Sequence, residues 1–309
     1  MTLREQVFGL LAEWVSKTEV GRRLGLSRHQ VYRMVLSDMS LGASGKPQEA
    51  TKWGMGAATL VPIPGGNRDE LVVFGSDFHF PDHDVNAIES FLWMIHKLQP
   101  DRVVLNGDIA DFFQLSRFNL SGDRVNELQE EIDMANEFRR LVRAKAPNAV
   151  IDETEGNHDN RVTTYVRKNA QALKSLRALQ PEALFRYREL EINWHPGCGF
   201  LLRKHFLVKH GSFVRGEAGA SAKAEFMAAG VSGISGHTHR LAPYKKSGYT
   251  PRVWWEQGCL CRLDPDYIIG KPNWEQGVMV GEFSTKSEHF VLHPVPFLDG
   301  KLRFGRESY

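Results

Sequence analysis

Five short blocks of the sequence carry residue types that bind divalent metal ions. They are Asp77-Phe78-His79, Gly107-Asp108, Gly156-Asn157-His158-Asp159, His210-Gly211 and Gly236-His237-Thr238-His239. Transition ions accept imidazole nitrogens together with carboxylate and amide oxygens. A carboxylate that bridges two such ions, with imidazoles and one amide in the other positions, suits a hydrolytic two-metal site. The blocks therefore predict chemistry of that kind.

Each block follows a short apolar run that is typical of a β-strand. The strands are expected at 71–75, 102–105 and 149–153, and further along at about 200–209, 233–235 and 252–257. Helical patterns at 85–98 and at about 123–144 separate the first three strands. This alternation predicts an α/β domain, in which ligands collect beyond the carboxyl ends of the strands. We therefore expect the five blocks to converge in space.

In this order, the blocks resemble the signature of the calcineurin-like metallophosphoesterase superfamily, over about residues 71–240. The layout is similar to phage and bacterial members of the nuclease and phosphodiesterase type. The resemblance implies a β-sandwich flanked by helices, with a catalytic domain at 71–309. It implies a first ion held by Asp77, His79, Asp108 and His239, and a second held by Asp108, Asn157, His210 and His237. Hydroxide held between the ions would attack phosphorus, and His158 would protonate the leaving oxygen.

Several residues near these blocks are candidates for supporting or substrate-binding roles. Asp111 matches the carboxylate that orients the catalytic histidine in relatives of the family. Protein phosphatases of the family carry an arginine directly after that position, whereas this chain has Phe112, which disfavours a phosphoprotein substrate. Arg161 and Arg240 are candidate substrate contacts, because guanidinium groups fit phosphate oxygens. Each could instead form a surface ion pair.

The first 40 residues predict a small helical module that resembles a helix-turn-helix. Gly25 supplies a tight turn and Ser27 a good N-cap for the second helix. Basic residues are concentrated there, with Lys17, Arg22, Arg23, Arg28 and Arg33 against Glu19. The second helix of such a unit enters the major groove, so the candidate DNA contacts are Arg28, His29, Gln30 and Arg33. A helical hairpin with a solvated basic face, or one that docks on a protein, is the alternative.

The rest of the sequence sets broad limits. Residues 41–70 are rich in Gly and Pro and are expected to form a linker. Hydrophobic residues at 42% and charged residues at 25% are ordinary for a globular chain of 309 residues. Cys198, Cys259 and Cys261 are an odd number, which argues against a disulfide framework. Without a long apolar run, we expect a cytoplasmic protein with no membrane segment. The oligomeric state stays open.

These observations predict a metal-dependent phosphoesterase. A phosphodiesterase or nuclease acting on DNA or RNA is favoured, with DNA preferred, because a basic helical module would hold a polyanion near the site. The alternative is a phosphomonoesterase acting on a nucleotide, a small phosphorylated metabolite or a phosphoprotein. A DNA-binding regulator with a passive phosphoesterase fold is a third possibility. The expected cofactors are two divalent ions, with manganese favoured and iron, zinc or nickel compatible with the same ligands.

Overall fold

The computed structural model describes residues 2, 3, 6, 22–26, 69–116, 127–197, 199–248, 252–264 and 272–309. The chain forms two compact units, Met1–Val61 and Pro62–Tyr309. In the first unit, residues 22–24 are helical and are followed by Gly25 with a φ of +66°. The predicted DNA contacts Arg28, His29, Gln30 and Arg33 lie outside the described residues. The helix-turn-helix and the domain boundaries therefore stay predictions.

A large mixed sheet forms one layer of the second unit. Among the described residues, its order is β13-β12-β11-β10-β1-β2-β3-β4. The parallel half consists of β1 (Glu70–Gly75), β2 (Arg102–Leu105), β3 (Val150–Thr154) and β4 (Ile192–His195). The antiparallel half consists of β10 (Gly277–Phe283), β11 (Phe290–Leu298), β12 (Lys301–Phe304) and β13 (Glu307–Ser308). The two halves join where β10 pairs with β1, so the end of the chain completes the sheet that β1 starts.

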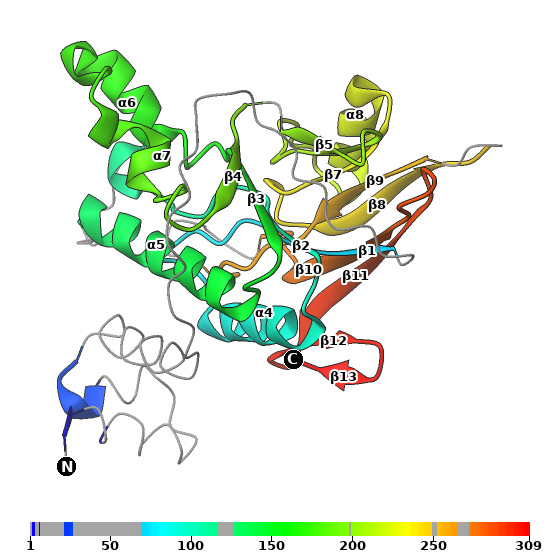
Figure 1. Cartoon of the computed structure of the whole chain (residues 1–309), viewed down its shortest axis with the longest axis horizontal. Coiled ribbons are helices and arrows are strands. Elements are labelled where there is room, and N and C mark those ends of the chain that lie inside the picture. The colour runs from blue at the N-terminus through cyan, green and yellow to red at the C-terminus, as the bar shows by residue number, and fades with distance from the viewer. Residues whose placement is uncertain are drawn as a thin grey trace. The chain divides into compact units, whose positions relative to one another are not determined.

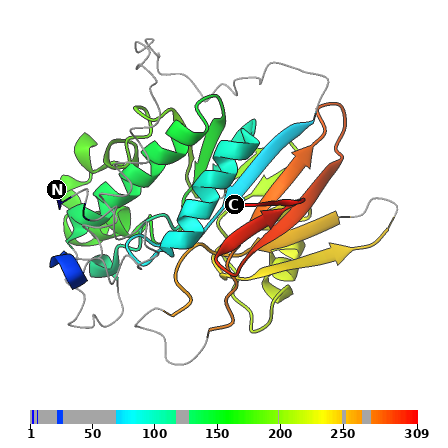
Figure 2. The ribbon, with the colours of Figure 1, turned by 90° about the horizontal axis from the view of Figure 1, so that it is seen from below.

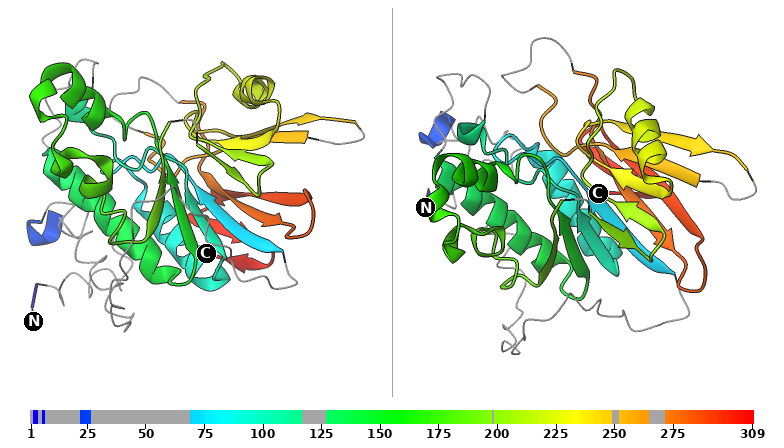
Figure 3. Two further views of the ribbon diagram at one scale, coloured as in Figure 1. Left: turned by 45° about the horizontal axis from the view of Figure 1, so that its top comes forward. Right: turned by 90° about the horizontal axis from the view of Figure 1, so that it is seen from above.

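A smaller mixed sheet has the order β5-β6-β7-β9-β8 among the described residues. Its strands are β5 (Phe200–Leu202), β6 (Phe206–Val208), β7 (Ser232–Ser235), β8 (Leu241–Lys246) and β9 (Arg252–Gln257). The two sheets stack face to face, with β6 to β9 in green and yellow above the cyan and red strands in Figure 3, left. Phe74 of β1 packs in one buried cluster with Phe206 and Ile234 of the smaller sheet. This core fixes how the strand ends of the two sheets face one another.

Helices cover the outer faces. The helices α4 (Val85–Leu98) and α5 (Leu128–Lys145) lie side by side on the large sheet (Figure 2). Ile88, Phe91 and Ile95 recur at helical spacing and are buried, and the Asp84 carboxylate caps the start of α4. The connection from β3 to β4 forms an outlying group at the upper left of Figure 1, which contains α6 (Arg161–Asn169), η2 (Gln171–Leu173), η3 (Arg177–Leu179) and α7 (Pro181–Leu184). The remaining elements are η1 (Phe113–Leu115) and α8 (Ala220–Ala229).

The predicted α/β class is confirmed as two mixed sheets with flanking helices. The predicted helix at 85–98 and the strands at 102–105 and 252–257 are confirmed at their predicted bounds. The single run predicted at 200–209 is wrong, because β5 and β6 form an antiparallel hairpin there. Arg203 and Lys204 turn the chain with φ values of +50° and +66°. No helix in the described part of the chain is long and apolar enough to cross a membrane.

Candidate metal centre

The five blocks meet at one edge of the molecule. Each lies in the loop directly after a strand, and these strands are β1, β2 and β3 of the large sheet and β6 and β7 of the smaller one. Because the strands run parallel within each sheet, their carboxyl ends point to the same edge. The structure thereby brings together all the predicted ligands, which are Asp77, His79, Asp108, Asn157, His210, His237 and His239.

One group of these ligands consists of Asp77, His79 and His239. The Nε2 atom of His239 lies 3.1 Å from Asp77 Oδ1 and 3.1 Å from His79 Nε2. All three residues are at most 6% exposed, so the surrounding protein shields the group from water. Two imidazoles and a carboxylate at such distances suit a divalent transition ion.

A second group consists of Asp108, His210 and His237, with Asn157 beside it. His210 Nε2 lies 3.1 Å from Asp108 Oδ2 and 3.2 Å from Asn157 Oδ1. The same Asp108 oxygen lies 3.7 Å from His79 Nε2, which belongs to the first group. Asp108 is therefore placed between the two groups, as a bridging carboxylate must be.

Three of these histidines are oriented through Nδ1, which leaves Nε2 facing the centre. The Nδ1 partners are Asp111 Oδ1 for His79 at 3.2 Å, the Asn106 carbonyl for His210 at 2.8 Å and Cys261 Sγ for His239 at 3.6 Å. Such outer partners fix the tautomer and the ring direction of metal-binding histidines. The ring positions are thus built into the fold.

Acidic and imidazole side chains of the centre shift one another's pKa values in opposite directions. Burial alone would raise the pKa of Asp77, but the neighbouring His239 and His210 outweigh burial and hold it below its ordinary value. Burial would lower the pKa of His210, but Asp108 and Asp77 raise it to about 9. Divalent ions and protons therefore compete for His210, since an imidazole binds a metal only when that nitrogen is deprotonated.

The backbone at the predicted ligands is strained. Left-handed φ values occur at Asp77 (+53°), His79 (+51°), Asp108 (+51°), His237 (+67°) and His239 (+57°). Such a conformation costs a non-glycine residue about 1–3 kcal/mol, and Asp and His are among the types that tolerate it better. Strain of this kind persists where function requires a particular side-chain direction. Its concentration on the ligands supports a functional centre.

Two glycines allow these strained loops to approach one another. A Cβ atom on Gly156 would lie 2.2 Å from the Asp108 backbone nitrogen. A Cβ atom on Gly236 would lie 1.9 Å from Ser76 Oγ and 2.4 Å from Asp77 Oδ2. Only glycine fits at these contacts, which explains why both predicted blocks begin with it.

His158 lies at the edge of the centre. Its Nδ1 atom is 2.7 Å from Asp111 Oδ1, and its Nε2 atom is 3.9 Å from Asp108 Oδ2. Burial would raise the pKa of Asp111, but His158 and His79 hold it below its ordinary value, so Asp111 stays ionised. The arrangement agrees with the predicted pairing of an orienting carboxylate with a catalytic histidine.

The two candidate arginines are used differently. Arg161 donates through Nη1 to the Asp111 carbonyl at 2.8 Å, and its Nη2 lies 3.2 Å from His158 Nε2. Arg240 instead donates to the backbone carbonyls of Arg215 at 2.5 Å and Asn273 at 3.2 Å. Arg161 therefore lies at the predicted acid, whereas Arg240 ties loops together and forms no ion pair within the described residues.

Two residues support the centre in roles that the sequence did not predict. The Asp159 carboxylate accepts hydrogen bonds from the backbone of Ile109 at 3.1 Å and of Gly156 at 3.1 Å, so it joins two ligand loops. Burial, together with Asp108 and Glu153, raises the pKa of Asp159 to about 7. The second residue is Cys261, the partner of His239. The sequence feature that could have indicated this role is the close spacing of Cys259 and Cys261. The two buried thiols and His239 lie near enough to share an ion.

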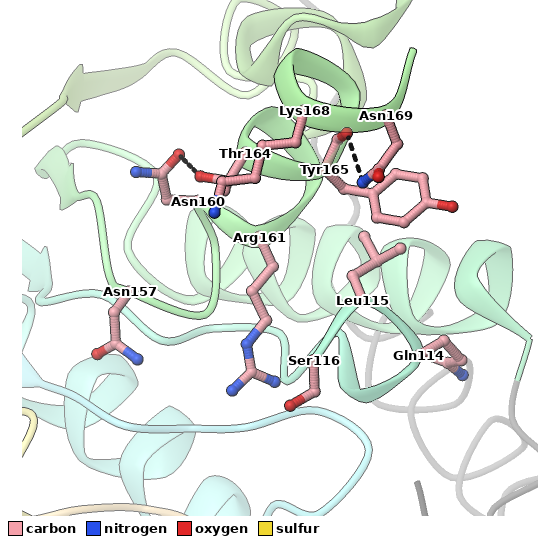
Figure 4. A pocket seen from close by; sticks show the side chains of 10 residues that line it. All are labelled: Gln114, Leu115, Ser116, Asn157, Asn160, Arg161, Thr164, Tyr165, Lys168 and Asn169. Atoms are coloured by element: carbon pink, nitrogen blue, oxygen red, sulfur yellow. Dashed lines mark hydrogen bonds between the residues drawn. The ribbon is translucent and has the colours of Figure 1, made fainter. Parts of the chain in front are cut away.

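A pocket of about 490 Å³ adjoins the centre at Asn157 (Figure 4). We call it the α6 pocket, because one wall consists of side chains from Arg161 to Asn169, the first and last residues of α6. Among the described residues its lining includes no carboxylate and consists of Gln114, Leu115, Ser116, Asn157, Asn160, Arg161, Thr164, Tyr165, Lys168 and Asn169.

Comparisons with known proteins give distant similarities. No protein-family model matches the chain. The Gene 54 protein of Mycobacterium phage L5 is 25% identical over 244 residues, which cover 74% of this chain and 94% of that protein. The Gene 54 protein of Mycobacterium phage D29 is 28% identical, with the same coverage of 74% and 94%.

Solved structures with a detectable likeness include a zinc complex of Vps29 from Entamoeba histolytica. It is 14% identical, with a TM-score of 0.42 over 77% of this chain and 98% of that chain. YfcE, described as a phosphoesterase from E. coli, is 13% identical, with a TM-score of 0.31 over 72% of this chain and 98% of that chain. At these levels, the function has to be argued from the centre itself.

Proposed function

We propose that this protein is a metal-dependent phosphoesterase that cleaves phosphodiester bonds, with DNA as the favoured substrate. The observation that carries the proposal is the pair of buried His and Asp groups on either side of Asp108, with His158 beside them. The donor set fits two divalent ions, because each group offers imidazole and carboxylate ligands from rigid strand ends. When bound, such ions supply Lewis acidity to phosphoryl oxygens and activate water as a nucleophile.

His158 has the environment of a general acid. The Asp111 carboxylate accepts a hydrogen bond from Nδ1–H and stabilises the cationic ring, which leaves Nε2 to donate to the leaving oxygen. Arg161 Nη2 now lies 3.2 Å from that Nε2 atom. A bound phosphoryl group would offer the guanidinium a better acceptor and would so release Nε2 for proton transfer.

The surroundings favour a diester over a monoester. A phosphomonoester carries close to two negative charges at neutral pH, whereas a diester carries one. Phe112 occupies the position after Asp111, is fully buried and stacks on Phe185 with ring centroids 5.9 Å apart. It therefore supplies no second cation next to Arg161, which suits a singly charged substrate.

A substrate panel tests the activity. With manganese, we expect hydrolysis of bis-para-nitrophenyl phosphate and of single-stranded DNA, and slower hydrolysis of para-nitrophenyl phosphate. Turnover of monoesters alone would instead identify the protein as a phosphomonoesterase acting on a nucleotide, a small metabolite or a phosphoprotein.

The leaving group tests the role of His158. We expect His158→Ala to slow DNA cleavage about 10²- to 10⁴-fold, because a sugar alkoxide leaves only when protonated. The loss should be smaller for the para-nitrophenyl diester, whose leaving group departs as an anion. His293→Ala is the matched control, because His293 on β11 forms an exposed ion pair with Glu282 on β10. An equal loss for both substrates would exclude His158 as the acid.

Metal content tests the centre independently of turnover. We expect about two manganese ions per wild-type chain by elemental analysis after equilibrium dialysis. In Asp108→Asn, the shared carboxylate is lost to both groups, so the content should fall below one ion per chain. Retention of two ions by this variant would contradict the bridging role.

A further inference from the structure

We propose that the α6 pocket and the exposed basic segment that continues from it, residues 161–180, form a binding track for single-stranded DNA. This inference rests on the proposed function and deepens it, because it names the strand that the centre receives and the surface that holds it. The catalytic unit would then bind its polymer without the N-terminal helices.

The pocket begins where the leaving group departs. Asn157 lies at one end and Tyr165 and Asn169 at the other, with Arg161 between them (Figure 4). Arg161 Nη2 lies 3.2 Å from His158 Nε2, the nitrogen that would protonate the leaving oxygen. A group that enters the pocket from the centre is therefore the part of the substrate beyond the cleaved bond.

The lining of the pocket suits a nucleotide. Arg161 and Lys168 are cations that can hold phosphate oxygens, and the part of the lining that the structure describes contains no carboxylate to oppose them. Tyr165 is 47% exposed and offers a ring face on which a base can stack. A volume of about 490 Å³ lies within the range of pockets that enclose small organic ligands.

The positive charge continues past the pocket. From Arg161 onward, the basic residues are Arg161, Arg167, Lys168, Lys174 and Arg177, and the first acid that follows is Glu182. The last four of these basic residues are exposed, and within the described residues they form no ion pair with a carboxylate. The whole chain carries a net charge of only +2, so its other residues together are net negative. Such a concentration of unpaired cations attracts the closely spaced phosphates of a polynucleotide.

A single strand fits this surface better than a duplex. A base can stack on Tyr165 only when it has left its neighbours, as in single-stranded DNA. Leu173 and Leu176, at 45% and 48% exposed, add apolar surface beside the basic residues. Apolar surface alone would also suit a protein partner, but the unopposed positive charge favours the nucleic acid.

The test uses the full-length protein and a fluorescent 20-nucleotide oligo(dT), with binding measured by anisotropy in EDTA. The variant Arg167→Glu/Lys168→Glu should bind the strand at least about 10-fold more weakly. The slope of log affinity against log salt should become shallower by about 1.4, the value for two lost phosphate contacts on a single strand. Lys245→Glu/Lys246→Glu, a double reversal of exposed lysines on β8, is the matched control and should change neither quantity.

Stacking is tested at Tyr165. Tyr165→Ala should weaken oligo(dT) binding about 10-fold, whereas Tyr165→Phe keeps the ring and should bind as wild type does. Unchanged binding in both the Arg167→Glu/Lys168→Glu and the Tyr165→Ala variants would overturn the track. So would an equal loss in the β8 control, tighter binding of oligo(U) than of oligo(dT), or a stronger effect on duplex than on single strands.

Failure of this inference can be told from failure of the proposed function. The ratio of kcat/KM for oligonucleotide cleavage to that for bis-para-nitrophenyl phosphate should fall at least about 10-fold in Arg167→Glu/Lys168→Glu. A wild-type protein that hydrolyses no diester would contradict the proposed function, yet the anisotropy measurement would still decide the track. Diester hydrolysis with an unchanged ratio would remove the track and leave the activity in place.

Discussion

Asp111 contacts histidines on both sides of the candidate centre. Its carboxylate lies 3.2 Å from His79 Nδ1 and 2.7 Å from His158 Nδ1, and the two rings meet edge to face at 4.5 Å. One residue therefore orients both a predicted metal ligand and the predicted acid. Substitution of Asp111 should therefore weaken both metal binding and proton transfer, whereas substitution of His158 should affect proton transfer alone.

Cys261 is a less expected partner at the residue scale. Its Sγ atom lies 3.6 Å from His239 Nδ1, where carboxylates and carbonyls are more usual. We expect Cys261→Ala to free the His239 ring and to weaken manganese binding about 10- to 100-fold, measured by competition with a chelator. Cys261→Ser keeps an acceptor and should lose less.

The neighbouring Cys259→Ala variant controls for the removal of a buried thiol. Cys259 is also fully buried, but its Sγ atom lies 3.7 Å from the Glu275 carbonyl. The two alanine variants should therefore differ in metal affinity. Equal weakening by both would show that the loss does not depend on the contact with His239 Nδ1, and would contradict an orienting role for Cys261.

At the scale of elements, a row of charged residues, in which Glu70, Arg102 and Asp152 are buried, joins the parallel strands. Arg102 on β2 donates through Nε to Glu70 on β1 at 2.8 Å and through Nη1 to Asp152 on β3. Asp152 also lies 2.7 Å from His195 Nε2 on β4. These contacts tie the four neighbouring strands together within the sheet, and the candidate metal ligands follow at the carboxyl ends of β1, β2 and β3.

This row predicts a pH-dependent contribution to stability. Burial would raise the pKa of Asp152, but His195 and Arg102 hold it below the ordinary value of 3.8. Because the folded pKa is depressed, the contribution is present above pH 3.8 and is lost as pH falls through the lower folded value. We expect Asp152→Asn to lower the free energy of unfolding by about 3 kcal/mol at pH 7, with a smaller difference below pH 4.

Urea unfolding at pH 7 and pH 3 measures both effects. Glu137→Gln is the matched control, since the Arg140–Glu137 pair on α5 is more than a third exposed on its arginine side. Exposed pairs contribute at most about 1 kcal/mol, so this variant should unfold nearly as wild type does. A difference for Asp152→Asn that stayed constant with pH would contradict the assigned carboxylate.

At the scale of the whole molecule, the centre depends on the stacking of two sheets. Asp77 follows β1 of the large sheet, whereas His237 and His239 follow β7 of the smaller one. The His237 backbone nitrogen donates to both Asp77 oxygens, at 3.0 and 2.9 Å, and so locks one loop onto the other. Neither sheet alone contains the ligands of the first group.

The division into units gives a prediction about the N-terminal helices. Deletion of residues 1–61 removes one compact unit and leaves the other with all the candidate ligands. We expect turnover of bis-para-nitrophenyl phosphate within about twofold of wild type, because catalysis is local to the centre. Affinity for duplex DNA should fall, because the deletion removes the predicted helix-turn-helix.

Point variants separate a DNA contact from other effects of the deletion. Arg28→Glu/Arg33→Glu should reproduce the loss of duplex affinity in the full-length chain, measured by anisotropy at several salt concentrations. Unchanged duplex binding in both would contradict the predicted helix-turn-helix contact and favour the alternative of protein docking or oligomerisation.

The sequence by itself determined which residues are candidate ligands and the order of the strands that present them. Metal-binding residue types in short blocks, each after an apolar run, are local features, and local patterns such as the helix at 85–98 survive folding unchanged. The tertiary structure alone decided which distant groups support them. Three features depend on loops from different strands: the contact of Cys261 with His239, the backbone contacts of Arg240 and the α6 pocket. The spacing of residues along the chain does not predict contacts between such distant segments.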